Sequence, residues 1–401
     1  MKEDFVLSAL RDSIAWLEAS PMQRMSLGSR ELFHSDFLSW LFEAYPRALA
    51  HVFDLSVENC KIAREEQNLD LVVYDGENPV LIVENKVKSY PDFAQLRRYS
   101  TKLPSVDKRY LLTLVSPGFE IPKGWETVLY KDLAAGLRRW FETSQVLSEH
   151  RQYIVDYITL LDHLVAVAQE CFDPAKIRET NFWFQGNQTQ FLEKVGFSQT
   201  LQKFQAMAFR DFLKQAVPAE TASSAFPALI SNDDAAPEEH HVKVWSALFN
   251  NTPCVTLEPV LANPDPEGLR FEIQIQGQQY RRLVAGPPLR DAVNLTTSRT
   301  EKSARTWECL EQFGADSWLF GRERTLSPDG KRCFELDEVK RRSKMRSDLC
   351  FYKPNVVYQY IDIVLESDRG ALPLKALPLQ ITRDIELAFE LLRHADKKKN
   401  P

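Results

Sequence analysis

The chain has 401 residues, of which 44% are hydrophobic and 26% charged, and its formal net charge is -6 at pH 7. This composition is typical of a soluble globular protein and excludes a disordered, fibrous or collagen-like chain. The length exceeds the usual size of a single core, so we expect two domains. Because the overall charge is negative, binding to nucleic acid would require a local basic surface.

The N-terminal residues Met1-Lys-Glu-Asp4 lack the basic start of a signal peptide. No apolar run approaches the roughly 18 residues that span a bilayer. We therefore expect a cytoplasmic protein that does not enter a membrane. The six cysteines are scattered, with no spacing typical of a metal site, so we interpret them as reduced thiols.

The first informative element is a helix over residues 31–42, in which apolar side chains recur at helical spacing. Glu31, His34 and Ser35 lie close together along its start. Three apolar runs then predict strands over residues 61–66, 69–74 and 80–87. Turn-forming residues 75–79 separate the last two strands.

Further elements alternate between helix and strand as far as residue 165, which predicts a mixed α/β layer. They are a helix over 92–103, strands over 109–115 and 125–130, and helices over 131–140 and 151–165. A helical block to about residue 216 and a linker or long loop over 217–237 follow. The remainder is α+β in character, with strands over 256–261, 269–275 and 351–365 and a terminal helix over 379–395.

Charged residues interrupt the two strands on either side of the turn. If residues 75–79 form the loop of a hairpin, Tyr74 pairs with Val80, and Asp70 lies opposite Glu84. Directly opposed carboxylates are destabilising unless a cation lies between them. Lys86 points to the same side as Glu84, because side chains alternate along a strand. The pattern indicates a site for a hard divalent cation, Mg²⁺ or Mn²⁺.

Asp70, followed after thirteen residues by Glu84-Asn-Lys86, resembles the PD-(D/E)xK signature of the restriction-endonuclease-like nucleases. Leu69 stands where the signature has proline, a residue commonly lost in the superfamily. The resemblance implies a restriction-endonuclease-like core, a mixed central sheet flanked by helices, in residues 1–170. It also implies that Asp70 and Glu84 hold the metal, that the carbonyl of Asn85 completes its shell, and that Lys86 assists the attacking water.

Two further matches refine the resemblance. Gln95 and Tyr99 in Gln95-Leu-Arg-Arg-Tyr99 are similar to the QxxxY motif of the RecB-like branch, and we expect both in the catalytic site. Their spacing sets them side by side on a helix. Glu31, His34 and Glu66 stand where bacterial members with an "IENK" strand carry Glu, His-Ser and Glu, which implies further metal ligands.

Two basic segments are candidates for binding phosphates. Arg97 and Arg98 lie beside the QxxxY motif, and five cations occur within residues 340–346. From the second segment we expect Lys340, Arg341 and Arg342 to contact nucleic acid. A solvated loop or helix face explains residues 340–346 equally well.

The first hypothesis is a Mg²⁺- or Mn²⁺-dependent endo- or exodeoxyribonuclease, with residues 171–401 as an α+β accessory domain that selects the substrate or a partner. The resemblance suits a role in bacterial or phage defence. The alternative is a non-catalytic nucleic-acid-binding or regulatory protein that retains the fold. The intact set of Asp70, Glu84 and Lys86 favours the enzyme. RNA as the substrate, a homodimer and a protein partner remain open at this stage.

Overall fold

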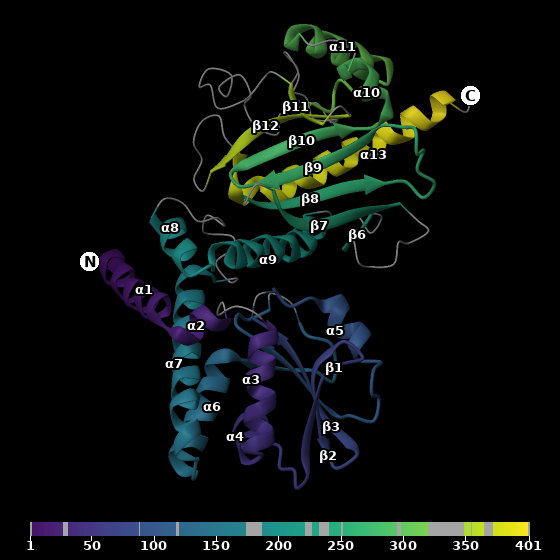
Figure 1. The fold of residues 1–401 in the computed structure, drawn as a ribbon. Coiled ribbons are helices and arrows are strands. Elements are labelled where there is room, and N and C mark those ends of the chain that lie inside the picture. The colour runs from purple at the N-terminus through teal and green to yellow at the C-terminus, as the bar shows by residue number, and fades with distance from the viewer. Residues whose placement is uncertain are drawn as a thin grey trace. The chain divides into compact units, whose positions relative to one another are not determined.

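A computed structural model describes residues 2–26, 31–87, 89–117, 120–173, 187–220, 227–231, 240–249, 252–294, 298–319, 349–353, 355–364 and 372–399. The chain divides into two compact units (Figure 1). Unit 1 comprises residues 1–175 and 184–208, and unit 2 comprises residues 176–183 and 209–401. The boundary at residues 170 and 171 inferred from the sequence stays a prediction.

Unit 1 is built on a five-stranded mixed sheet with the strand order β1-β2-β3-β4-β5. The strands are β1 Cys60–Glu66, β2 Leu69–Asp75, β3 Asn78–Lys86, β4 Lys108–Thr113 and β5 Glu126–Leu129. The first three strands pair antiparallel, whereas β4 and β5 continue the sheet in parallel. This arrangement is the α/β core with a mixed sheet that the sequence predicted.

Helices cover both faces of this sheet. The helices that lie within unit 1 are α1 Lys2–Ala19, α2 Pro21–Ser26, α3 Glu31–Ala44, α4 Arg47–Phe53, α5 Phe93–Tyr99, α6 Tyr130–Thr143, α7 Ser148–Cys171 and α8 Asn187–Lys194. Helix α3 packs on β1, β2 and β3. On the α5 side, Leu96 joins a buried cluster with Val72 and Ile82. The sheet is therefore the middle of three layers.

The β2–β3 hairpin confirms the predicted register near the charged residues but not at its tip. Leu71 pairs with Val83, and the same register carried one residue further places Asp70 opposite Glu84. The predicted five-residue loop is wrong, because the strands continue to a pair between Asp75 and Asn78. A bulge after Val73 absorbs the one-residue difference.

The connection between β1 and β2 is equally tight. Gln67 and Asn68 both have positive φ, 53° and 63°, which is the backbone of a two-residue hairpin turn. Asp70 follows this turn after a single residue, Leu69, whose side chain is fully buried. The position of Asp70 is therefore set by a rigid hairpin end.

Unit 2 is α+β, as the sequence predicted for this half, and contains an eight-stranded sheet with the path β11-β12-β10-β9-β8-β7-β6. The strands are β6 Ala228–Ser231, β7 His241–Phe249, β8 Thr252–Val260, β9 Arg270–Gln276, β10 Gln279–Ala285, β11 Cys350–Lys353, β12 Val356–Val364 and β13 Leu372–Pro373. Strand β13 pairs in parallel with β12.

The helices of unit 2 are α10 Pro287–Asn294, α11 Arg299–Gln312, η2 Leu374–Ala376 and α13 Leu377–Lys399. Helix α13 runs across the sheet and contacts β8 and β9 (Figure 1). Helix α9, Ser198–Ala219, crosses the boundary between the units. The end of α9 and strand β6 fall within residues 217–237, the segment interpreted from its composition as a linker or loop. Among the helices in the described part of the chain, none has the length and apolarity to cross a membrane.

Helix α6 approaches α4 closely at Gly136. An added Cβ there would lie 2.7 Å from the carbonyl oxygen of His51 and 3.1 Å from a methyl group of Val52. On an open helix surface, Gly→Ala stabilises by about 1 kcal/mol. We expect the clash to outweigh this, so that Gly136→Ala lowers the free energy of unfolding by about 1–3 kcal/mol.

Urea denaturation followed by tryptophan fluorescence measures this effect. Ala135→Gly, at the neighbouring and partly exposed position, is the matched control and tests helix propensity without the contact. A Gly136→Ala variant as stable as the unmodified chain would contradict this packing of α6 on α4.

Candidate metal and catalytic site

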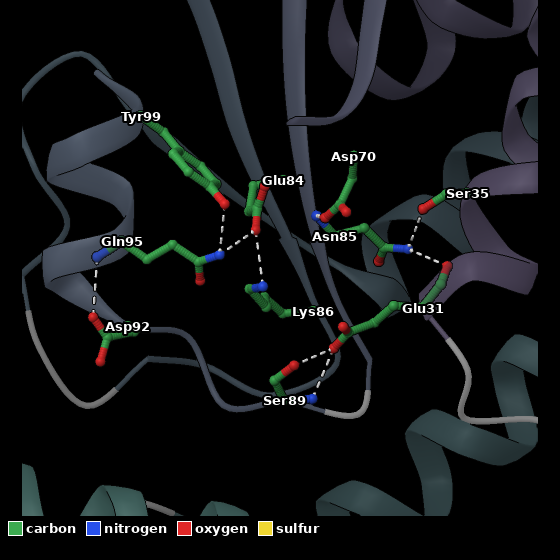
Figure 2. Close-up of polar contacts among 10 residues, drawn as sticks. All are labelled: Glu31, Ser35, Asp70, Glu84, Asn85, Lys86, Ser89, Asp92, Gln95 and Tyr99. Carbon is green, nitrogen blue, oxygen red and sulfur yellow. Dashed lines mark hydrogen bonds and ion pairs between the residues drawn. The ribbon is translucent and has the colours of Figure 1, made fainter. Parts of the chain in front are cut away.

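The C-terminal end of β3 carries the charged residues that the sequence singled out. Because side chains alternate, Glu84 and Lys86 point to the α5 face, where their ion pair spans 2.8 Å. Both side chains are buried, with exposed fractions of 2% for Glu84 and 9% for Lys86. Figure 2 shows the lysine ammonium directed at the glutamate carboxylate.

Helix α5 brings the predicted Gln95 and Tyr99 to this pair. The Gln95 amide donates to Glu84 Oε1 over 3.0 Å and contacts the Tyr99 hydroxyl, also at 3.0 Å (Figure 2). Asp92 caps the helix, because its carboxylate accepts from the Gln95 backbone N–H at 3.0 Å. The cap fixes where α5 begins and thereby where Gln95 meets Glu84.

Asp70 reaches the same site from β2. Its Oδ2 accepts from the backbone N–H of Asn85 at 2.7 Å. In a strand, the N–H and C=O of one residue point to the same side, so the Asn85 carbonyl also faces Asp70. The side chain of Asp70, the side chain of Glu84 and the carbonyl of Asn85 therefore lie around one space.

The Asn85 side chain points to the opposite face and is fully buried. Its amide nitrogen donates to Ser35 Oγ at 3.1 Å and to the Glu31 carbonyl at 3.2 Å (Figure 2). Its amide oxygen accepts from the Tyr130 hydroxyl at 2.6 Å. Asn85 thus connects the C-terminal end of β3 to α3 and to the first residue of α6.

Burial dominates the electrostatics of the carboxyl groups. It raises the pKa of Glu84 to about 8, with Lys86 opposing the shift and Asp70 adding to it. Burial likewise raises the pKa of Asp70, although the hydrogen bond from Asn85 opposes this. Burial alone would lower the pKa of Lys86, but the neighbouring carboxylates, Glu84 first, outweigh it, and the pKa is raised. Lys86 therefore carries its charge at neutral pH.

These groups fit a hard divalent cation. Glu84 Oε2 is buried and has no hydrogen-bond partner among the described residues, as expected of an atom that a cation would bind. Two carboxylates and a carbonyl are the ligands that Mg²⁺ and Mn²⁺ prefer, with water completing the shell. Within the described ranges, no three His, Cys, Asp or Glu side chains form a metal cluster. A cation here would rest on Asp70, Glu84 and the Asn85 carbonyl.

The three further metal ligands implied by the resemblance have different surroundings. Glu31 faces the site, and its Oε1 accepts from the Ser89 backbone N–H at 2.8 Å and from the Ser89 hydroxyl (Figure 2). The His34 ring is fully buried and lies 3.1 Å from the Tyr157 hydroxyl. Glu66 accepts from the Tyr74 hydroxyl at 2.8 and 2.9 Å. Metal binding by these three stays a prediction.

The two basic segments that the sequence singled out also differ in where the structure places them. Arg97 and Arg98 are exposed on α5, the helix that carries Gln95. The run that includes Lys340, Arg341 and Arg342 lies outside the described residues. Of these two basic segments, only the first therefore lies on an element that contributes to the candidate site, and phosphate binding by either stays a prediction.

Sequence reasoning missed three contributors: Tyr130, Ser89 and Asp92. Asp92 had a readable signal, since an aspartate after Pro91 and before an amphipathic run is an N-cap pattern. Tyr130 and Ser89 had none, because each meets its partner, Asn85 or Glu31, only through the packing of separate elements.

Comparison with known proteins agrees with this geometry. Residues 48–115 match the family model of the PD-(D/E)XK nuclease superfamily, a segment that includes β1 to β4 and the residues from Asp70 to Tyr99. A search of curated proteins and a search of solved structures each found no match. The similarity therefore concerns the sheet and site of unit 1.

We expect Mn²⁺ to bind unit 1 through Asp70 and Glu84. Asp70→Asn and Glu84→Gln keep the shape of each side chain but remove the charge, so each should weaken Mn²⁺ binding at least about tenfold in calorimetry. Glu126→Gln, an exposed carboxylate on β5, is the matched control. Undiminished affinity in both site variants would remove the metal assignment.

The affinity for Mn²⁺ should also depend on pH. A protonated Glu84 is a poor ligand, so a cation must displace its proton at any pH below the raised pKa of about 8. Affinity should therefore rise about tenfold per pH unit below that value and level off above it. Calorimetry across this range measures the slope, and Glu84→Gln should abolish this part of it. A flat profile in the unmodified chain would contradict proton displacement.

Proposed function

We propose that this chain is a metal-dependent nuclease that hydrolyses phosphodiester bonds of DNA with Mg²⁺ or Mn²⁺. The observation that carries the proposal is the buried pair of Glu84 and Lys86 beside the half-buried Asp70, with Glu84 Oε2 left without a partner among the described residues. The match of residues 48–115 to the nuclease superfamily supports it. The "IENK" type and the QxxxY motif are the finer assignment that we propose within that superfamily.

The protein groups have separable parts in such a reaction. A bound cation polarises the phosphate and lowers the pKa of a coordinated water. Gln95 holds the Glu84 carboxylate through a hydrogen bond of 3.0 Å. Lys86 remains cationic and therefore stabilises negative charge on the phosphate oxygens in the transition state instead of removing a proton from water.

The alternative is a binding or regulatory protein that retains the fold without catalysis. The direct contacts among Lys86, Glu84 and Gln95 favour the enzyme, because a protein that only binds has no need of a buried ammonium beside the candidate metal ligand Glu84. A role in bacterial defence against foreign DNA is part of the proposal and rests on the sequence resemblance alone.

Lys86→Ala tests the assignment of roles. The substitution removes the ammonium that would stabilise the transition state but removes no metal ligand. We therefore expect cleavage to fall at least about a hundredfold while Mn²⁺ still binds. Lys131→Ala, an exposed lysine on α6, is the control for loss of one cation. The assay follows labelled single- and double-stranded DNA and RNA with Mg²⁺ or Mn²⁺, and EDTA should abolish cleavage.

Two results would contradict the proposal. Loss of Mn²⁺ binding in Lys86→Ala would assign the lysine to the structure of the site. Absence of cleavage of every substrate by the unmodified chain, with Mn²⁺ bound, would favour the binding or regulatory protein.

A further inference from the structure

Among the described residues of unit 2, one arginine has no acidic partner for its charge. Arg281 on β10 is half-buried, and every polar partner of its guanidinium is a glutamine side chain. Neither a hydrogen bond nor an ion pair joins it to Asp or Glu among the described residues. Burying a cation without an anion costs free energy, and binding of an anion would lower that cost.

The neighbouring arginine shows the contrast. Arg282 points to the α13 face and forms an ion pair of 2.6 Å with Asp384. Arg210, which is also buried, pairs with Asp211 at 2.8 Å. Each of these two arginines in unit 2 has a carboxylate partner, whereas Arg281 has none in the part of the chain that the structure describes.

Three glutamines hold the Arg281 guanidinium in a fixed orientation. Nε and Nη2 donate to Gln279 Oε1 at 3.0 and 2.6 Å, and Nη1 donates to Gln274 Oε1 at 3.2 Å and to Gln276 Oε1. An arginine has five N–H groups, and these bonds use four of them. The fifth, on Nη2, and the full positive charge are left for an anion.

One tyrosine ring lies beside this guanidinium, and a second tyrosine pairs with Arg281 across the strands. Its carbon lies 4.9 Å from the centre of the Tyr358 ring. Tyr360 is paired with Arg281 across β10 and β12, and both tyrosines are half-buried on the face opposite α13. A cation beside aromatic rings is the combination that binds the phosphate and the stacked bases of single-stranded nucleic acid.

We propose that Arg281 binds a backbone phosphate of single-stranded nucleic acid, with a base stacked on Tyr360. The choice of ligand rests on the nuclease function proposed for unit 1. The amide oxygens of the three glutamines are turned to Arg281, and the Gln276 amide nitrogen donates to the Phe249 carbonyl. These side chains form a frame and do not read bases, so the site has little sequence preference.

Binding of a labelled oligothymidylate to the full chain tests the proposal. EDTA is present, so the result does not depend on cleavage, and failure of the nuclease function would leave this measurement intact. Arg281→Gln should weaken binding and lower the slope of log affinity against log salt by about 0.7, the value for one phosphate contact on a single strand. Arg305→Gln removes an exposed, ion-paired arginine of unit 2 and should change neither quantity.

A second pair of variants separates stacking from folding. Tyr360→Ala should weaken binding at least about fivefold, whereas Tyr360→Phe, which keeps the ring, should not. Thermal melting of each variant identifies any that fails to fold, and Tyr360→Phe then remains as the folded reference.

Three outcomes would overturn the proposal. The first is an unchanged salt slope in Arg281→Gln, and the second is equal binding by Tyr360→Ala and Tyr360→Phe. The third concerns the source of the phosphate. If calorimetry shows that Arg281→Gln abolishes binding of inorganic phosphate while oligonucleotide affinity is unchanged, the site takes a free anion and not a strand.

Discussion

The burial of the Glu84 carboxylate is the constraint on which the rest of unit 1 depends. The Glu84 side chain has an exposed fraction of 2%, so its polar atoms need partners within the protein, and Lys86 and Gln95 contact its Oε1 from two different elements. The register of β2 with β3 places Asp70 opposite Glu84, and the Asp92 cap of α5 places Gln95 beside it. The β2–β3 hairpin, the start of α5 and the end of β3 thus all contribute groups that surround the buried Glu84 side chain.

Side chains alternate between the two faces of β3, so three consecutive residues can serve both the candidate site and the packing of the strand on helices. Glu84 and Lys86 face α5 and the candidate cation, whereas Asn85 faces α3 and α6 and satisfies its whole amide there. Movement of α6 would therefore act on the Asn85 side chain through the Tyr130 hydroxyl. The structural and chemical parts of the Glu-Asn-Lys motif cannot be varied independently.

Local patterns in the sequence were sufficient for most of unit 1. Alternating apolar runs located β2 and β3, and symmetry about the turn placed Asp70 opposite Glu84, although the tip of the hairpin is tighter than expected. The contacts that the sequence did not predict, such as the hydrogen bond between Tyr130 and Asn85, depend on the packing of elements that are distant in the sequence. The contacts of Arg281 with Gln274 and Gln276 likewise depend on the pairing of β9 with β10, whereas Gln279 is two residues from Arg281 on the same strand.

The bulge after Val73 separates the tip of the β2–β3 hairpin from the register at Leu71 and Val83. Gly76 stands at φ 63° with open space around the position of a side chain. Additional residues at this tip would lengthen the ribbon without rotating Asp70 away from Glu84. The hairpin end is consequently a place where a fluorophore or an affinity handle can be attached while the charged cluster at the other end of the strands keeps its geometry.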